Sequence, residues 1–414
     1  MRYTGHLGIV AEHNAMTARV TFEWWFYPTS LCKAVRIRTV ALVVLAGIGC
    51  AGSDLEWIEH PIADSLASAS SLVGVIRADA HDEAPENLVF AARELATLKP
   101  SATIGTLDGA KGYVIGQIED AVLVADGTVD AGGAVVALDG RFNEIKVYDI
   151  DGTFRSAIGG PGRGPGELAI PKGLTRDTRG IVYVADENLE IHRFDSTKDG
   201  WPFIDKIFTE FLAFDICALG SDLYVLGVKA TVPDVVHRFD SAGAYRESFG
   251  RPYRTGAIDV RYSLSEGKIL CDEERHQVVV GFTRLPEIHA YGSDGELRWI
   301  SRIRGFSPPA VLEHVEGRRF RVGLPDDRDV MHQLVSIARL GHSSIVLQVG
   351  KYTRAAWEAR KSFEQVESYV VDLTRGIGEG FEGELPLIAD ARDQYVLGYA
   401  NDPFPKLTVY TVSR

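Results

Sequence analysis

The stretch GGPGRGPGELAIPKGLTRDTRGIVYVADENLEIHRFD, Gly159 to Asp195, places a glycine- and proline-rich connection before two short alternating segments. A glycine-rich loop binds phosphate when a helix follows it, because the helix presents free N–H groups to the anion. Here Pro161, Pro165 and Pro171 remove backbone donors, and the residues from Leu174 onward follow a strand, turn and strand pattern. The stretch therefore predicts an ordered connection between antiparallel strands rather than a phosphate site.

The alternating segment that ends this stretch recurs along the chain. Copies are EIKVYDIDG (144–152), EIHRFDSTKDG (190–200), VVHRFDSAG (235–243), EIHAYGSDG (287–295), SYVVDLTRG (368–376) and KLTVYTVSR (406–414). Their strands end at Asp149, Asp195, Asp240, Gly292, Asp372 and Thr411, which lie 46, 45, 52, 80 and 39 residues apart. Six units of roughly this period predict a β-propeller, in which each unit is a four-stranded antiparallel blade.

The ends of the chain complete this pattern. SATIGTLDG (101–109) resembles the fourth strand of a unit, and the last unit stops after its third strand. We therefore expect an all-β, six-bladed β-propeller over residues 100–414. Residues 101–105 are expected to complete the last blade and to remove its open edge. Residues 50–99 should then form a tether outside the ring, with a possible short helix over NLVFAARELATL.

On these residues the chain resembles the NHL or TolB-like six-bladed β-propellers, and among them the bacterial propeller lipoproteins with a GPGE segment before a strand ending in aspartate. The match is strong in one blade and partial in three others. The resemblance implies the propeller fold over residues 101–414. It leaves the activity open, because this group includes carbohydrate- and protein-binding modules as well as lactonases and lyases with a central metal.

The N-terminal region predicts export. Basic residues precede an apolar run at 39–49, which is too short to span a bilayer, so residues 1–49 are typical of a signal segment. Gly49-Cys50 resembles a bacterial lipoprotein cleavage site, although Gly47 stands where an aliphatic residue is usual. A plain signal peptide cut nearby is the alternative, and the start codon stays open between Met1 and a later position such as Met16. We expect a protein held on the periplasmic side or cell surface of a bacterial membrane by an N-terminal lipid only.

Candidate ligand-binding residues lie in the departures from the regular unit. Insertions at 304–329 and 350–364 interrupt the fifth unit and carry basic and aromatic side chains. The candidates are Arg319, Arg354 and Trp357, together with Arg163 of the glycine stretch and His332, which is predicted to begin an inner strand near the channel mouth. They suit a small anionic ligand, a carbohydrate or a protein partner. The alternative is that Trp357 anchors a helix on the rim.

Several other classes of function find little support. A net charge of −13 without a basic stripe argues against a nucleic-acid partner. His192, His237 and His289 share one position in separate units, so we expect structural roles rather than a zinc site. Asp215 is one of several acidic residues available near inner strands, but no motif selects it. We expect a monomeric binding module with no catalytic residues, metal or cofactor. A lactonase-like hydrolase or lyase with Ca²⁺ or Zn²⁺ at the central channel is the alternative.

The two cysteines in the predicted propeller, Cys217 and Cys271, are expected in inner strands of adjacent blades 3 and 4, as near neighbours. An exported protein permits a disulfide between them. A disulfide requires Cα atoms within about 7 Å, and this strict limit favours two buried free thiols instead.

We expect cleavage before Cys50 and attachment of lipid to its Sγ atom. Mass spectrometry of protein from the membrane fraction should show a modified N-terminal Cys50, because the basic flank and apolar run direct export and Gly49-Cys50 supplies the cleavage site. Soluble protein with an unmodified N-terminus elsewhere would contradict the anchor and leave secretion standing.

Overall fold

The computed structural model describes residues 56–57, 73–77, 85–124, 133–253, 258–314, 319–323, 328–359 and 363–412. Cys50 and the predicted export segment lie outside these residues. Asp54–Arg414 forms one compact unit by its internal contacts.

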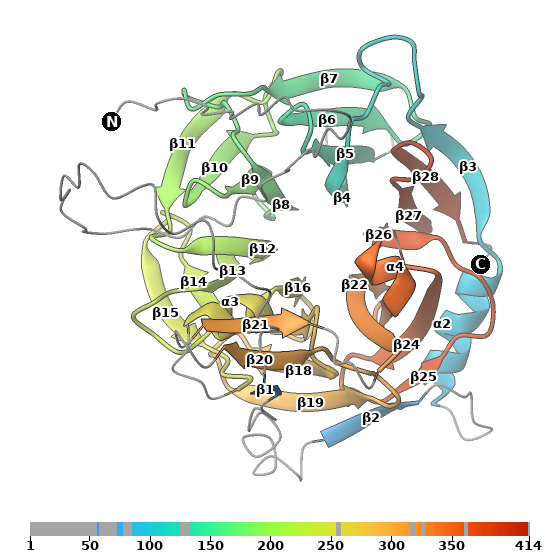
Figure 1. Cartoon of the computed structure of the whole chain (residues 1–414). Coiled ribbons are helices and arrows are strands. Elements are labelled where there is room, and N and C mark those ends of the chain that lie inside the picture. Colours follow the sequence, from blue (N-terminus) through green and yellow to red (C-terminus); the bar gives the residue numbers. More distant parts are fainter. Residues whose placement is uncertain are drawn as a thin grey trace, which may run out of the picture. The chain divides into compact units, whose positions relative to one another are not determined.

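Six four-stranded antiparallel blades surround a central channel, and the first strand of each blade lies innermost (Figure 1). Blade 1 contains β4 (Ile118–Val124), β5 (Ala134–Asp139), β6 (Glu144–Asp149) and β7 (Phe154–Gly159), and blade 2 contains β8 (Pro171–Arg176), β9 (Ile181–Asp186), β10 (Glu190–Asp195) and β11 (Phe203–Phe208). Blade 3 contains β12 (Leu212–Leu219), β13 (Asp222–Val228), β14 (Val236–Phe239) and β15 (Tyr245–Phe249).

Blade 4 contains β16 (Gly267–Asp272), β17 (Gln277–Phe282), β18 (Glu287–Gly292) and β19 (Leu297–Ile303). Blade 5 contains β22 (Val330–Leu340), β23 (Ser344–Thr353), β24 (Gln365–Asp372) and the short β25 (Gly378–Gly380), and blade 6 contains β26 (Leu387–Arg392), β27 (Tyr395–Ala400), β28 (Lys406–Thr411) and β3 (Lys99–Ile104). The predicted all-β six-bladed propeller is confirmed.

The ring closes through pairing of β3 with β28. Ile104 pairs with Leu407 and Ala102 with Val409 in antiparallel register. Both Ile104 and Leu407 are completely buried. The N-terminal strand therefore completes the last blade, as predicted from the missing fourth strand of the last unit.

Residues 73–77 form β2, a strand that the sequence did not indicate. β2 (Val73–Arg77) runs parallel to β19 on one side and to β25 on the other, which joins blades 4 and 5 into one sheet. Ile76 is fully buried between the two blades, and a Cβ atom at Gly378 would lie only 3.2 Å from its side chain. The segment expected to be a tether outside the ring thus supplies part of it.

Helix α2 (Glu86–Ala96) follows in the region where a short helix was expected. Leu88, Ala91 and Leu95 form its buried face and pack in one cluster with Leu340 of blade 5 and Ile388 of blade 6. The spacing of these three residues places them on one side of a helix. The helix therefore seals the junction between the last two blades.

The main apolar core lies between neighbouring blades. Val136 and Val147 of blade 1 share a buried cluster with Val182, Val184 and Phe194 of blade 2. β-branched residues suit strands that are covered on both faces. The blades therefore stack face to face around the channel.

The connections between blades follow the predicted pattern. The glycine stretch joins β7 to β8 with no helix, and Leu168 donates its backbone N–H to the carbonyl of Gly160 at 2.8 Å. The first insertion contains β20 (Ala310–His314) and β21 (Arg319–Gly323), with β1 (Glu56–Trp57) paired to β20. Helix α3 (Ile258–Ser265) precedes blade 4, and α4 (Arg354–Glu358) lies in the second insertion.

Cys217 of β12 and Cys271 of β16 form a disulfide, with Cα atoms 5.6 Å apart. Their expected proximity across the junction of blades 3 and 4 is confirmed, whereas the favoured pair of free thiols is wrong. The two inner strands were expected to lie slightly farther apart than the limit for a disulfide, but at these residues they converge to within it (Figure 1).

Substituting Ile104→Ala should lower the free energy of unfolding by about 2–5 kcal/mol, because it leaves a cavity where β3 closes the ring. Leu107→Ala, three residues away at a side chain that is 74% exposed, should change it by less than about 0.5 kcal/mol. Urea denaturation of both variants measures the difference. Equal unfolding midpoints would contradict closure through β3.

Replacing both cysteines, as Cys217→Ser with Cys271→Ser, should lower the free energy of unfolding by about 4 kcal/mol. The disulfide closes a loop of 54 residues, and opening it restores conformational entropy to the unfolded chain. Denaturation of oxidised wild type, reduced wild type and the double variant tests this. Indistinguishable curves for oxidised wild type and the double variant would refute a stabilising crosslink.

Candidate functional site

The central channel is the candidate site. A cavity of 1270 Å³ is lined by the inner strands of all six blades and by one side of α2. The lining also includes the turn that follows β22 at Gly341, and Tyr399 of β27. A cavity of this size accommodates a small molecule or the side chains of a partner.

A β-bulge gives the inner strands a common geometry. The pairing register shifts near the beginning of β4, β8, β12 and β26 and in the middle of β22, whereas β16 pairs without a shift. A bulge leaves one residue out of the ladder and re-aims the side chain beside it. Asp120, Asp215 and Asp390 occupy this same position in blades 1, 3 and 6. Ser336 takes the place in blade 5 and Gly173 in blade 2.

Each of these aspartates joins its own blade to the next. Asp120 accepts N–H bonds from Ala121 at 2.8 Å and from Leu174 of blade 2 at 2.7 Å. Asp215 accepts from Ile269 of blade 4 at 3.0 Å. The bonds bring the carboxylates to the channel wall and satisfy backbone donors there.

Asp390 closes the series around the ring. Its Oδ2 atom accepts the N–H of Leu123 in blade 1 at 2.8 Å, and its Oδ1 atom accepts the N–H of Ala391 at 2.8 Å. The same arrangement thus links blade 6 to blade 1, 1 to 2, and 3 to 4. Each carboxylate is fixed by two backbone donors, so its orientation does not depend on a ligand.

Lys268 is the only lysine among the described residues that line the channel. It lies in β16, the inner strand without a bulge, and the nearby Asp215 carboxylate raises the pKa of its ammonium group. Asp120 and Glu119 act in the same direction. Lys268 is therefore a permanent cation surrounded by carboxylates from blades 1 and 3.

The channel carboxylates hold their protons more tightly than exposed ones. Burial raises the pKa of Asp215 and Asp390 to about 6, and it also raises the pKa of Asp120. Backbone N–H bonds oppose this shift in all three, as do Lys268 at Asp120 and Asp215 and Arg392 at Asp390, without cancelling it. Near neutral pH Asp215 and Asp390 are ionised, and below pH 6 they become protonated.

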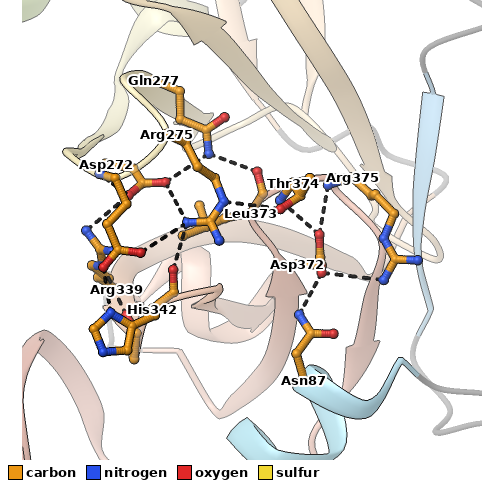
Figure 2. Close-up of polar contacts among 12 residues, drawn as sticks. Asn87, Asp272, Arg275, Gln277, Arg339, His342, Asp372, Leu373, Thr374 and Arg375 are labelled. Carbon is orange, nitrogen blue, oxygen red and sulfur yellow. Dashed lines mark hydrogen bonds and ion pairs between the residues drawn. The ribbon is translucent and has the colours of Figure 1, made fainter.

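A second polar cluster fixes the junction of blades 4 and 5 (Figure 2), and its members Asn87, Arg339 and His342 also line the cavity. Asp272 is completely buried and accepts hydrogen bonds or ion pairs from Arg275 and Arg339, both at 3.1 Å. On the other side of the network, Asn87 of α2 donates to Asp372 at 2.6 Å. The charges of this cluster are matched with one another, and we assign it a structural role.

The residues proposed from the sequence lie away from the channel, and none of the five belongs to its described lining. Arg163 is exposed on the glycine stretch between blades 1 and 2, and Arg319 lies in β21. His332, Arg354 and Trp357 lie together at one end of blade 5. The five are thus distributed over three connections and do not form one site.

The local contacts of the blade 5 residues are those of packing. The Nδ1 atom of His332 accepts the N–H of Ser307 at 2.9 Å. Arg354 donates to the carbonyl of Arg328 at 2.7 Å. The ring of Trp357 lies edge-on to Tyr352 with centroids 6.0 Å apart, which supports the alternative that it anchors a helix on the rim.

The three repeated histidines are buried in separate blades. Burial lowers the pKa of His237 to about 4 and of His289 to about 3, and it also lowers the pKa of His192. Such side chains stay neutral at physiological pH and pack within their sheets. Among the described residues, no group of three or more His, Cys, Asp or Glu side chains is arranged to hold a metal ion.

Sequence reasoning did not select Asp120, Asp390 or Lys268. An available signal was the aspartate followed by an aliphatic residue near the beginning of the first strand, in EDAVLV, FDICAL and ADAR. Aligning the first strands of the units, rather than the third strands that resemble one another more, would have placed Asp120, Asp215 and Asp390 at one equivalent position. Lys268 would still have been missed, because its strand lacks the bulge.

Comparison with solved structures supports the fold. A candidate exported protein from Bacteroides fragilis aligns with a TM-score of 0.52 at 10% identity, covering 83% of this chain and 100% of the other. A member of the DUF4221 family from Bacteroides vulgatus aligns with a TM-score of 0.48 at 10% identity, covering 77% and 98%. No family model matches the chain, and no curated protein matches it.

Within the described part of the chain, no helix is long and apolar enough to cross a membrane. At 10% identity the first alignment carries the β-propeller architecture and no activity. The chain is a six-bladed β-propeller similar in fold to that Bacteroides protein.

Proposed function

We propose that this protein is an exported, non-enzymatic β-propeller that binds a small, positively charged molecule in its central channel. The observation that carries the proposal is the imbalance of charge in the wall. The described lining carries ten carboxylate side chains, among them Asp120, Asp215 and Asp390, against four Lys or Arg side chains. A cationic ligand supplies the missing positive charge in a site of low dielectric, where ion pairing is strong.

Hydrogen-bonding capacity supports the same ligand class. Each of the three carboxylates accepts two backbone N–H bonds, which leaves further lone pairs on its oxygens for a ligand. An ammonium group supplies several donors and no acceptor. The channel thus favours a cation over the small anion that the insertions suggested.

Export and the lipid anchor at Cys50 belong to this proposal. The signal-like segment supports export, and so does the name of the Bacteroides fragilis protein with a similar fold. The NHL or TolB-like subtype rests on the GPGE stretch and its strands. We propose a monomer, because the repeat and closing strand complete the ring within one chain.

Isothermal titration calorimetry with spermidine, a small triamine, tests the channel. At low ionic strength we expect binding at pH 8 that weakens about tenfold or more at pH 5. Asp215 and Asp390 have pKa values of about 6, so they are ionised at pH 8 and protonated at pH 5, and the cation favours their ionised form.

Lys268→Met should strengthen spermidine binding, because it removes the competing positive charge. Lys111→Met removes the same charge from a surface side chain that is 85% exposed and should change little. Citrate serves as the anionic probe. Tighter binding of citrate than of spermidine, or equal effects of the two lysine substitutions, would contradict a cation-binding channel.

A further inference from the structure

The disulfide lies in the wall of the channel. Cys217 and Cys271 both line the cavity, in the inner strands β12 and β16. Cys217 is 6% exposed, whereas Cys271 is only partly buried. Cys271 is thus the more exposed partner of the disulfide. The disulfide therefore lies at the border between the apolar cluster of blades 3 and 4 and the cavity.

The surroundings of the disulfide are strongly acidic. Asp215 lies two residues before Cys217 in the same strand, and Glu273 lies two residues after Cys271. Over the whole described lining, ten carboxylates face four Lys or Arg side chains. Charge of one sign in a cleft with low-dielectric walls raises the local concentration of solutes of the opposite sign and lowers that of like sign.

We propose that the Cys217–Cys271 disulfide is a thiol-exchange site reached through the channel, and that the acidic wall selects cationic thiols over anionic ones. The proposal holds whether or not the channel also binds a ligand. It assigns the disulfide a chemical role in addition to its contribution to stability.

The exchange requires two equivalents of an external thiol. The first thiolate attacks Sγ of Cys271, the protein S–S bond breaks, and Cys217 leaves as a thiolate that takes up a proton. A second thiolate attacks the external sulfur of the mixed disulfide and releases Cys271. The protein disulfide gains two electrons, and the two external thiols are oxidised to their own disulfide.

Blades 3 and 4 remain linked after the disulfide is reduced. Asp215 still accepts the N–H of Ile269 at 3.0 Å, two residues from the broken bond, and it holds β12 beside β16. Breaking the disulfide therefore frees this part of the wall without removing every link between blades 3 and 4.

The experiment compares two thiols of similar size and opposite charge on the folded full chain at pH 8: cysteamine and 2-mercaptoethanesulfonate. Reduction is followed by quenching with an alkylating reagent and mass spectrometry of the peptides containing Cys217 and Cys271. Each rate is divided by the rate on the same protein unfolded in urea, which corrects for the thiol's own reactivity. Circular dichroism confirms that the protein remains folded.

We expect cysteamine to be favoured about tenfold over 2-mercaptoethanesulfonate in the folded protein, and this preference should approach unity in 1 M salt. Glu273→Gln should lower the preference, because it removes a lining charge near Cys271. Glu296→Gln, in the exposed turn between β18 and β19, is the matched control and should not.

Two results would overturn the proposal. Absence of reduction in the folded protein would show that the disulfide is closed to the channel. A preference equal to that of the unfolded protein, unaffected by salt, would show that exchange follows unfolding or ignores the charge of the wall. Because the wild-type chain alone gives both readings, the test does not depend on whether a variant folds.

Discussion

The hydrogen bonds that backbone N–H groups of one blade donate to the bulge aspartates of the preceding blade are the interaction on which the ring and its channel both depend. The inner strand of each blade is an edge strand, so a backbone N–H on its open side needs a partner from outside its own ladder. A charged acceptor makes a strong bond, and losing it leaves a buried donor at a cost of about 1–3 kcal/mol. Asp120, Asp215 and Asp390 provide that acceptor at three junctions.

These aspartates also place a cost on the folded state. The pKa values of Asp215 and Asp390 are higher in the folded protein than in the unfolded chain. Their protonated forms therefore favour folding fully below about pH 4, and this contribution to the free energy of unfolding is lost as the pH rises through about 6. Near neutral pH the ring therefore keeps ionised carboxylates in poorly solvated positions. Groups held in this way concentrate at functional sites, which is why the channel is the better candidate than the matched charges around Asp272.

The fold was more accessible from the sequence than the site. Repeated strands, their period and the missing fourth strand of the last unit are local patterns, and they predicted the blades and the closure by β3. β2 was not predicted, because its short alternating run gives no indication that its partners are strands some 230 and 300 residues later. The placement of Asp120, Asp215 and Asp390 in the channel depends on β-bulges, and a bulge changes the pairing register without a clear signature in the sequence. Whether Cys217 and Cys271 form a disulfide depends on the distance between two blades, and the spacing of residues along the chain does not give that distance.

The N-terminal residues 73–104 contribute to blades 4, 5 and 6 through β2, α2 and β3, and this placement has a kinetic consequence. During synthesis these residues are made about 230 residues or more before the strands with which they pair. The strands of blades 1–3 follow one another along the chain, so these blades can form as they leave the ribosome. The apolar residues of β2, α2 and β3 stay exposed until their partner strands have been synthesised. Pairings between residues far apart in sequence form slowly, and strands that are still unpaired make the unfinished chain prone to aggregation. The protein is therefore expected to need a chaperone that holds its early segment until β28 has been made.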